Sequence, residues 1–264
     1  MHNDPASLGN GSARAGSNLS QREALLELHP DDGALLRLSP TDIAQYIRLA
    51  QCRRYLRLRL LEQNTGTSFM RAWDAQPQSI PPLLTLSGRD FEAGAETEIG
   101  KHAHTSACSR DNRKARGIES DNQQLIDTVQ NLLPGDREVV FQPMLRAALD
   151  GWELSGIADA IDFQRADDGR LSAFIIDFKS TTAARMEHRL QIAFYREMLD
   201  AILRPAGIEC EIELGILYRG APDDTAEPDD PKLLAQRDDA LATFGVNGFL
   251  ERIEDANALR RDVF

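Results

Sequence analysis

Asp177 and Lys179 have the residue types and spacing for metal-assisted chemistry. They lie two residues apart at the end of an apolar segment, 171–179, whose side chains predict a buried central strand. Successive side chains of a strand leave opposite faces, so the carboxylate and the ammonium share one face while Phe178 packs on the other. Charges at the end of so apolar a strand must be paired or bound to something. The alternative is a solvated strand face, where such pairs are common.

Asp159 is a second carboxylate that we expect beside the first. It lies in a predicted strand, 152–163, and the Asp168-Gly169 turn after this strand predicts a hairpin. Neighbouring strands are ~4.8 Å apart, so Asp159 and Asp177 can share a divalent cation. A ligand set made only of oxygens favours Mg²⁺ or Mn²⁺ over zinc. The alternative for Asp159 is a surface position.

A helix predicted to run to about Leu203 follows these strands. On it, His188, Gln191 and Tyr195 lie within about 60° of one another, and apolar residues mark a different face that packs on the sheet. The polar face could orient Lys179 or contact a phosphate group of a ligand. The alternative is ordinary hydrogen bonding of buried polar groups.

A dense basic segment near the N-terminus contrasts with the rest of this acidic chain, whose net charge is −12. The segment, 53–59, continues a helix that is predicted to begin upstream at the Ser39-Pro40 pair. The contrast indicates a surface that faces phosphate groups, although a solvated, ion-paired helix face explains it equally well. The candidate contacts are Arg53, Arg54, Arg57 and Arg59.

The elements that must position these residues follow the order helix, three strands, helix, strand. The hydrophobic period changes from about 3.6 to 2 after residue 135, and turn signals recur at short intervals. Two further helices are predicted upstream, and the first carries Glu98 and His102 one turn apart. The predicted helices are 89–105 and 122–133, and the predicted strands are 138–146, 152–163, 171–179 and 210–218.

The 264 residues, of which 42% are hydrophobic, are enough to bury a sizeable core. We predict a mobile tail (1–34), one principal domain (35–220), an acidic linker (221–232) and a C-terminal helical segment (233–264). No stretch reaches the ~18 apolar residues of a membrane span, and the first residues lack the order of a secretion signal. We therefore expect a cytoplasmic protein without a membrane partner.

Four short motifs resemble, in family order, those of RecB-type nucleases in the PD-(D/E)XK superfamily, including the CRISPR-associated RecB-like exonucleases. They are the segment 38–55, GIAD at 156–159, IDFK at 176–179 and QIAFY at 191–195. The resemblance implies an α/β fold with a restriction-endonuclease-like αβββαβ core. In this core, helices flank a central mixed sheet, and further helical elements precede it.

The resemblance also implies roles for the residues of the last three motifs. Asp159 and Asp177 would be metal ligands, and the carbonyl group of Phe178 could complete the ligand set. Lys179 would polarise or deprotonate the attacking water. Gln191 and Tyr195 would position that water or the scissile phosphate.

The family has one more metal ligand upstream, which is matched less cleanly. The segment 94–98 resembles the variant in which this ligand is a glutamate, so we predict Glu98. His102, one turn later, resembles the histidine variant and is the substitute.

Many relatives also hold an iron–sulfur cluster, with one cysteine near the start of the domain and three near its end. Such a cluster normally needs four thiolates. Cys52 matches the first position, but Cys210 is the only cysteine after the predicted active-site helix. We therefore predict that this chain holds no iron–sulfur cluster.

The function that follows is a DNA nuclease dependent on Mg²⁺ or Mn²⁺. We expect an exonuclease that acts on single strands or DNA ends in repair, recombination or CRISPR-type defence. His188 and the four arginines would contact the DNA, and a helicase or another nucleic-acid-processing protein is a possible partner. One alternative is a catalytically silent, nuclease-like subunit that binds DNA or a helicase. Another is an acidic interaction protein whose motif matches are accidental.

Overall fold

The computed structural model describes residues 36–66, 82–108, 111, 113–114, 120–220 and 230–254. The predicted tail, 1–34, and most of the predicted linker lie outside the described residues. Among the described helices, none combines the length and the apolar composition needed to cross a bilayer.

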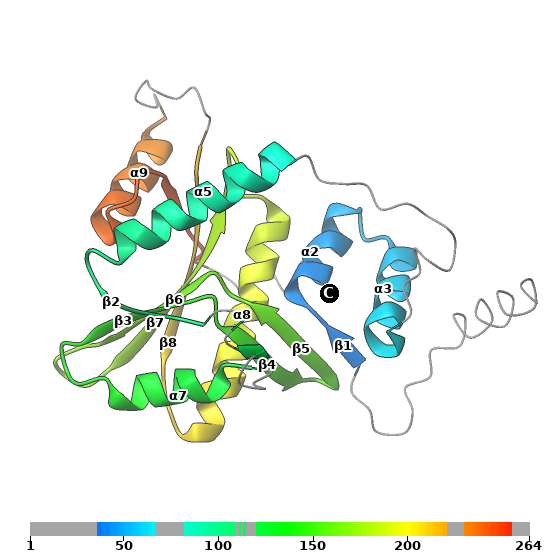
Figure 1. Cartoon of the computed structure of the whole chain (residues 1–264), viewed down its shortest axis with the longest axis horizontal. Coiled ribbons are helices and arrows are strands. Elements are labelled where there is room, and N and C mark those ends of the chain that lie inside the picture. Colours follow the sequence, from blue (N-terminus) through cyan, green and yellow to red (C-terminus); the bar gives the residue numbers. More distant parts are fainter. Residues whose placement is uncertain are drawn as a thin grey trace, which may run out of the picture.

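A six-stranded mixed sheet forms the centre of the fold (Figure 1). Its central strand β7 pairs antiparallel with β6 and parallel with β8. The strands in spatial order are β2 (His104–Ala107), β3 (Arg137–Phe141), β6 (Ala160–Arg165), β7 (Leu171–Lys179), β8 (Glu211–Tyr218) and β9 (Phe249–Arg252). The predicted strand 171–179 is confirmed with both of its bounds, because its apolar run is buried on both faces.

Two long predicted strands are each divided by a bend. Instead of 138–146 the chain forms β3 and β4 (Met144–Leu149), and instead of 152–163 it forms β5 (Trp152–Ile157) and β6. Strands β4 and β5 leave the large sheet and pair with each other in a second, three-stranded sheet, whose third strand, β1 (Leu36–Leu38), pairs with β5. Pro143 lies at the first bend, and a proline argues against a continuous central strand, but the prediction of a single strand 138–146 did not use this signal.

The bends lie side by side and are joined by backbone hydrogen bonds. The N–H group of Gln142 donates to the carbonyl of Asp159 at 2.9 Å, and Ala158 donates to Pro143 at 3.2 Å. Gln142 has a φ of 53°, a left-handed conformation that is uncommon for a residue other than glycine. Asp159 therefore lies in a bend that is hydrogen-bonded to the bend at 142–143, and not within a straight strand as predicted.

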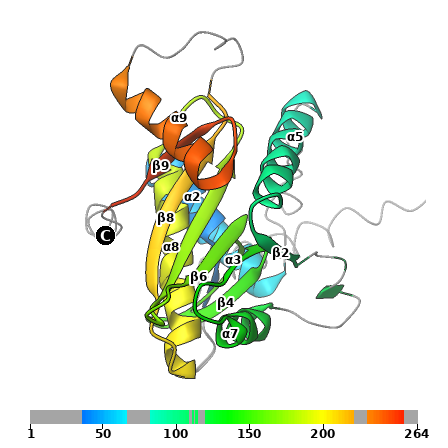
Figure 2. The same cartoon turned by 90° about the vertical axis from the view of Figure 1, so that its left-hand side faces the viewer.

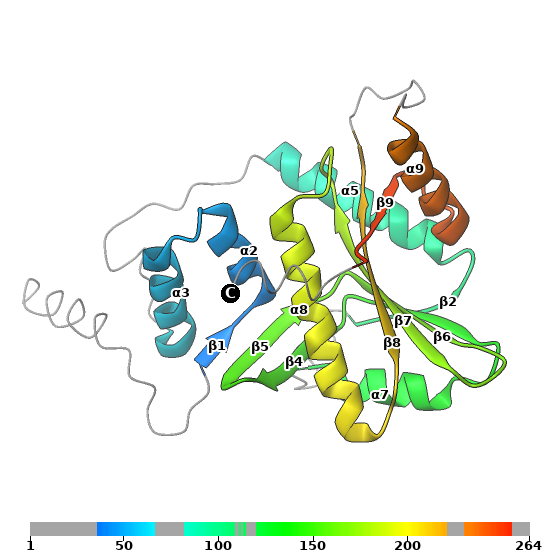
Figure 3. The ribbon, with the colours of Figure 1, turned by 180° about the vertical axis from the view of Figure 1, so that it is seen from behind.

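Helices cover both faces of the large sheet (Figures 2 and 3). One buried core lies between the sheet and helices α7 (Asn122–Asn131) and α8 (Met186–Leu203). A second core includes α5 (Pro82–Ile99) and α9 (Pro231–Phe244). The predicted αβββαβ core, with its mixed sheet between helices, is confirmed.

The N-terminal helices lie beside the small sheet (Figure 1). Helix α2 (Pro40–Arg48) begins with Ser39 as its N-cap, and α3 (Arg53–Thr65) follows a short turn. Helix α2 packs against α8, and α3 packs against β1 and α2. The sequence predicts helical elements before the core, but as one helix that continues into the basic segment; the left-handed conformations of Ala50 and Gln51 divide it into two.

Two predicted helical segments contain strands. The predicted helix 89–105 ends at Ile99, and residues 104–107 form β2, which pairs parallel with β3. The predicted C-terminal helical segment contains α9 but also β9, which pairs antiparallel with β8. In both cases the deciding hydrogen bonds are made to residues distant in the sequence, which local propensity does not show.

Candidate active site

Asp159, Asp177 and Lys179 converge at the end of β7. The Nζ atom of Lys179 lies 2.7 Å from Oδ1 of Asp177 and 4.0 Å from Oδ2 of Asp159. The carboxylate of Asp159 also accepts a hydrogen bond from the backbone N–H of Phe178 at 2.7 Å. The structure thus brings together the two acids and the lysine that the sequence analysis selects.

The pairing register explains this convergence. Ala160 lies opposite Ile176 in the β6–β7 pair, so Asp159, one residue earlier, faces Asp177, one residue later. Because side chains alternate along β7, Phe178 is buried in the second core while its neighbours lie on the other face.

Burial sets the electrostatics of this cluster. The pKa of Asp177 is raised to about 8, first because burial disfavours the charged carboxylate and then because Asp159 is negative, although Lys179 acts in the opposite direction. Burial lowers the pKa of Lys179, but the charges of Asp177 and Asp159 outweigh it and raise that pKa. Lys179 is therefore held as an ammonium ion.

Asp177 retains an unused binding capacity. Its Oδ2 atom is buried and has no hydrogen-bond partner among the described residues. Asp121 Oδ1 shares this property, but its carboxylate is neutralised by Arg113 at 2.6 Å within the same buried pair. Of these two described oxygens, that of Asp177 has a second aspartate, Asp159, beside it, an arrangement that fits a divalent cation.

No three His, Cys, Asp or Glu side chains form a ready-made metal cage in the described part of the chain. Mg²⁺ does not require one, because it usually keeps several waters and takes only one or two carboxylates. Asp159 and Asp177 supply two, and the main chain at Phe178 is adjacent.

Glu92 and Glu96 on α5 also face the cluster, and sequence reasoning missed them. Burial raises the pKa of both, and the negative charge of Asp159 adds to the effect. Lys179 lowers the pKa of Glu92. Glu96 accepts a hydrogen bond from the side-chain amide of Gln142 at 3.1 Å. The available signal was their spacing of four residues beside the buried apolar positions of the helix.

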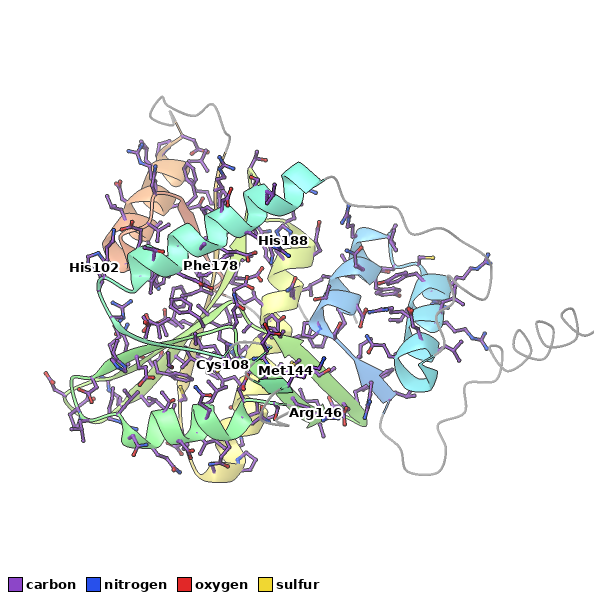
Figure 4. All side chains as sticks on the ribbon, in the orientation of Figure 1. His102, Cys108, Met144, Arg146, Phe178 and His188 are labelled. Carbon is purple, nitrogen blue, oxygen red and sulfur yellow. The ribbon has the colours of Figure 1, made fainter. Side chains whose placement is uncertain are left out.

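The structure does not bring Glu98 or His102 into the cluster. Glu98 is about 120° around α5 from Glu92 and pairs with Lys101 at 2.7 Å. His102 follows the end of the helix, and a Cβ atom at Gly245 would lie 2.8 Å from its Nε2 (Figure 4). The prediction assumed one helix through both residues, whereas the helix ends at Ile99.

Tyr195 supports the bend before Asp159. Its hydroxyl group is buried and donates to the carbonyl of Ile157 at 2.6 Å. Burial raises its pKa, and a hydrogen bond with Gln191 acts in the opposite direction. A Cβ atom at Gly156 would lie 3.0 Å from the Tyr195 ring and 2.9 Å from Pro40, which accounts for glycine at this position.

His188 lies in the first turn of α8 (Figure 4), close enough to Lys179 for the charge of the lysine to act on it. Its Nδ1 atom accepts a hydrogen bond from the backbone of Arg185 at 3.3 Å. Burial, and next the positive charge of Lys179, lower its pKa to about 4. A neutral His188 at pH 7 can contact a phosphate only as a hydrogen-bond donor and not as a cation.

The four arginines of the basic segment have different environments. Arg53, Arg54 and Arg57 are exposed on α3. Arg59 instead binds the buried carboxylate of Asp42 at 2.6 Å and Glu62 at 2.8 Å. Its charge is therefore engaged in holding α2 against α3, and as a DNA contact it is the weakest of the four candidates.

Comparison with known proteins gives the family. The model of the PD-(D/E)XK nuclease superfamily matches residues 103–262. The crystal structure of the protein SSO0001 is 15% identical with a TM-score of 0.32, covering 87% of this chain and 86% of that one. A Eubacterium rectale protein to which exonuclease activity has been ascribed is 9% identical with a TM-score of 0.37, covering 99% of this chain and 82% of its own.

The two structural similarities are too distant to transfer a function, and no curated protein matches the chain. The family match, however, spans more than half of the sequence and includes Asp159, Asp177 and Lys179. It agrees with the mixed sheet and with the αβββαβ order of the core. The chain is therefore a member of the PD-(D/E)XK nuclease superfamily, whose members are hydrolytic nucleases acting on nucleic acid.

Proposed function

We propose that this chain is a deoxyribonuclease of the RecB type that depends on Mg²⁺ or Mn²⁺ and hydrolyses phosphodiester bonds in single strands or at DNA ends. The buried Oδ2 atom of Asp177, left without a hydrogen bond beside Asp159 and Lys179, carries this proposal. An unsatisfied buried oxygen costs stability, and here a second carboxylate beside it adds to that cost, which a bound cation would offset.

Asp159 and Asp177 would hold the cation, with the main chain of Phe178 and with Glu92 or Glu96 on the facing helix. When bound, the cation neutralises charge on the phosphate, lowers the pKa of its water and steadies the leaving oxygen. Asp177 must release its proton to serve as a ligand, because its pKa without metal is about 8.

Lys179 acts in this proposal as a hydrogen-bond donor and not as a base. Its raised pKa opposes loss of the ammonium proton at neutral pH. The ammonium group can donate to the attacking water or to a phosphate oxygen and so stabilise developing negative charge. Gln191 and Tyr195 keep this geometry by supporting the backbone at Ile157, two residues before Asp159.

The finer proposal is an exonuclease of DNA repair, recombination or CRISPR-type defence that works beside a helicase or a similar protein. The order of the motifs from Gly156 to Tyr195 supports it. Digestion of linear DNA with sparing of a covalently closed circle tests the exonuclease part. Cleavage of the circle would instead show endonuclease action.

The decisive experiment incubates wild type and Lys179→Ala with end-labelled single- and double-stranded DNA in Mg²⁺, Mn²⁺ or EDTA. We expect cleavage by the wild type that EDTA abolishes, and a loss of roughly 10²–10³-fold in Lys179→Ala, since it removes one donor to developing charge. Equal cleavage by both proteins, or none with any metal, would overturn the proposal.

Glu92→Gln and Glu98→Gln form a matched pair that locates the upstream ligand. Both remove one negative charge from α5, but only Glu92 interacts with Asp159 and Lys179. We expect Glu92→Gln to lower the cleavage rate at least tenfold, about 1.4 kcal/mol, and to raise the Mg²⁺ concentration needed. Glu98→Gln should remain within about twofold of wild type. The reverse pattern would restore the prediction made from the sequence.

A further inference from the structure

An open cleft lies between α5 and the end of β8, outside the cluster of acids and lysine. Its volume is about 600 Å³, which is ample for a nucleotide. Its described lining consists of Leu86, Ser87, Asp90, Phe91 and Arg219. Two of these side chains are apolar, one is cationic, one is a hydroxyl and one is acidic.

The cleft adjoins the candidate active site through the backbone. The N–H group of Arg219 donates to the carbonyl of Lys179 at 3.1 Å, and the next N–H donates to Thr181. From the other wall, a Cβ atom at Gly88 would lie 3.8 Å from the hydroxyl of Ser180. Glu92 directly follows Phe91 on α5. The cleft and the acids therefore lie on either side of the residues that follow β7.

Arg219 has an uncompensated positive charge within the part of the chain that the structure describes. Its guanidinium group donates to Ser87 Oγ at 2.7 Å, a neutral acceptor, and no described carboxylate forms an ion pair with it. Other arginines packed on this sheet are paired, such as Arg189 with Glu251 and Arg137 with Asp162. An exposed guanidinium fork beside a hydroxyl group that still has a proton to donate matches the oxygens of a phosphate.

We infer that this cleft is a substrate subsite that receives a nucleotide flanking the scissile bond. Arg219 and Ser87 bind its phosphate, and the apolar side chains of Leu86 and Phe91 contact its sugar or base. The inference deepens the proposed nuclease function and rests on it for the identity of the ligand. The negative charge of Asp90 repels an anion in the same cleft, so removing this charge should strengthen binding, whereas removing the charge of Arg219 should weaken it.

Binding of a labelled single-stranded oligodeoxynucleotide, followed by fluorescence anisotropy in EDTA at low ionic strength, tests the subsite without cleavage. We expect Arg219→Ala to raise the Kd about tenfold. Because one phosphate contact is lost, the plot of log Kd against log salt concentration should become less steep by ~0.7. Ser87→Ala should raise the Kd less, about two- to threefold, because it removes one neutral hydrogen bond. Asp90→Asn should lower the Kd.

Arg170→Ala is the matched control. It also removes an exposed arginine, but from the hairpin turn after β6, where Arg170 pairs with Asp168. We expect its Kd to remain that of wild type. An Arg219→Ala protein that binds DNA like wild type, or no more weakly than Arg170→Ala, would overturn the subsite. Arg219→Lys, which keeps the charge but loses the fork, should give an intermediate Kd and replaces Arg219→Ala if that variant is unstable.

The two proposals fail in different ways. If wild type cleaves DNA and Arg219→Ala binds it unchanged, the subsite is wrong and the nuclease function stands. If no metal supports cleavage and Arg219→Ala still weakens binding, the cleft binds DNA and the catalytic proposal is wrong. In an active enzyme, Arg219→Ala should raise KM several-fold more than it lowers kcat, because it removes binding and leaves the reacting groups in place.

Discussion

Two buried aspartates in this molecule have opposite surroundings. Asp42, at the start of α2, accepts hydrogen bonds on both oxygens: Ser39 donates through its backbone and its hydroxyl, and Arg59 and Gln63 donate from α3. Asp177, at the end of β7, has one oxygen bonded to Lys179, and its other oxygen has no hydrogen-bond partner among the described residues. Both side chains are at most 3% exposed, so burial alone does not distinguish them.

This comparison distinguishes a carboxylate with a structural role from a carboxylate that is available to bind a ligand. The surroundings of Asp42 use its whole capacity to cap one helix and to hold another, and nothing is left for a ligand. The surroundings of Asp177 place a second acid close by and leave one oxygen without a described partner. This arrangement lowers the stability of the fold, and such destabilising features cluster at functional sites. Unsatisfied capacity beside a second charge is therefore the better indicator of function.

Asp177→Asn should give the largest effect on activity. We expect cleavage to fall by roughly 10³-fold or more, equivalent to about 4 kcal/mol of lost transition-state stabilisation, because the cation loses an anionic ligand. The protein should still unfold cooperatively with near wild-type stability. Steady-state cleavage and chemical denaturation of one preparation check both parts, and retention of most activity would contradict the metal-binding role.

Asp42→Ala should show the opposite pattern. It removes the acceptor of Gln63, one of the two acidic partners of Arg59 and half of the Ser39 capping box, so we expect a loss of about 3 kcal/mol in the free energy of unfolding. The cleavage rate, measured well below the melting temperature, should remain within a few-fold of wild type. A variant as stable as wild type would show that the paired carboxylate contributes nothing net.

The pH dependence of the metal-free protein should give a smaller effect. The pKa of Asp177 is about 8 in the folded state and 3.8 unfolded, so between these values the folded protein holds the additional proton. Its contribution to stability is complete below about pH 4 and is lost as the pH rises through about 8. From pH 6 to pH 8 in EDTA, we expect the free energy of unfolding to fall by about 1–3 kcal/mol.

Asp177→Asn is the control for that fall, because an amide does not titrate. Thermal or urea denaturation at both pH values, with wild type and variant in parallel, isolates the contribution of this carboxyl group. Adding Mg²⁺ at pH 8 should restore the stability of the wild type but not of the variant. Equal pH dependence in the two proteins would mean that Asp177 is ionised throughout this range.

The strand β7 shows what could be predicted from the sequence. Its apolar run, its turn at Asp168-Gly169 and the alternation of Asp177, Phe178 and Lys179 are local properties, and the structure has all three. The upstream acid shows what could not. Whether Glu92 or Glu98 faces the sheet depends on which side of α5 is buried, and that side is selected by packing with α9 and β7.

The bends at 142–143 and 158–159 are further features that the sequence analysis did not predict. The chain turns there to form the second sheet, in which Leu36 of β1 pairs with Trp152 of β5, 116 residues later in the sequence. The described contacts of Gln142 with Asp159 and Glu96 follow from that bend. No local pattern contains them, because they join segments that meet only after the fold has formed.

The amino-acid sequence by itself determined the αβββαβ order of the core, the pair of charges on β7 and the family motifs, since hydrophobic period and turn chemistry act over a few residues. Only the tertiary structure decided that α5 presents Glu92 and Glu96 to Asp159 and that Arg219 has no acidic partner among the described residues. The physical reason is that distance, burial and charge compensation between remote segments are properties of packing, which a local pattern does not encode.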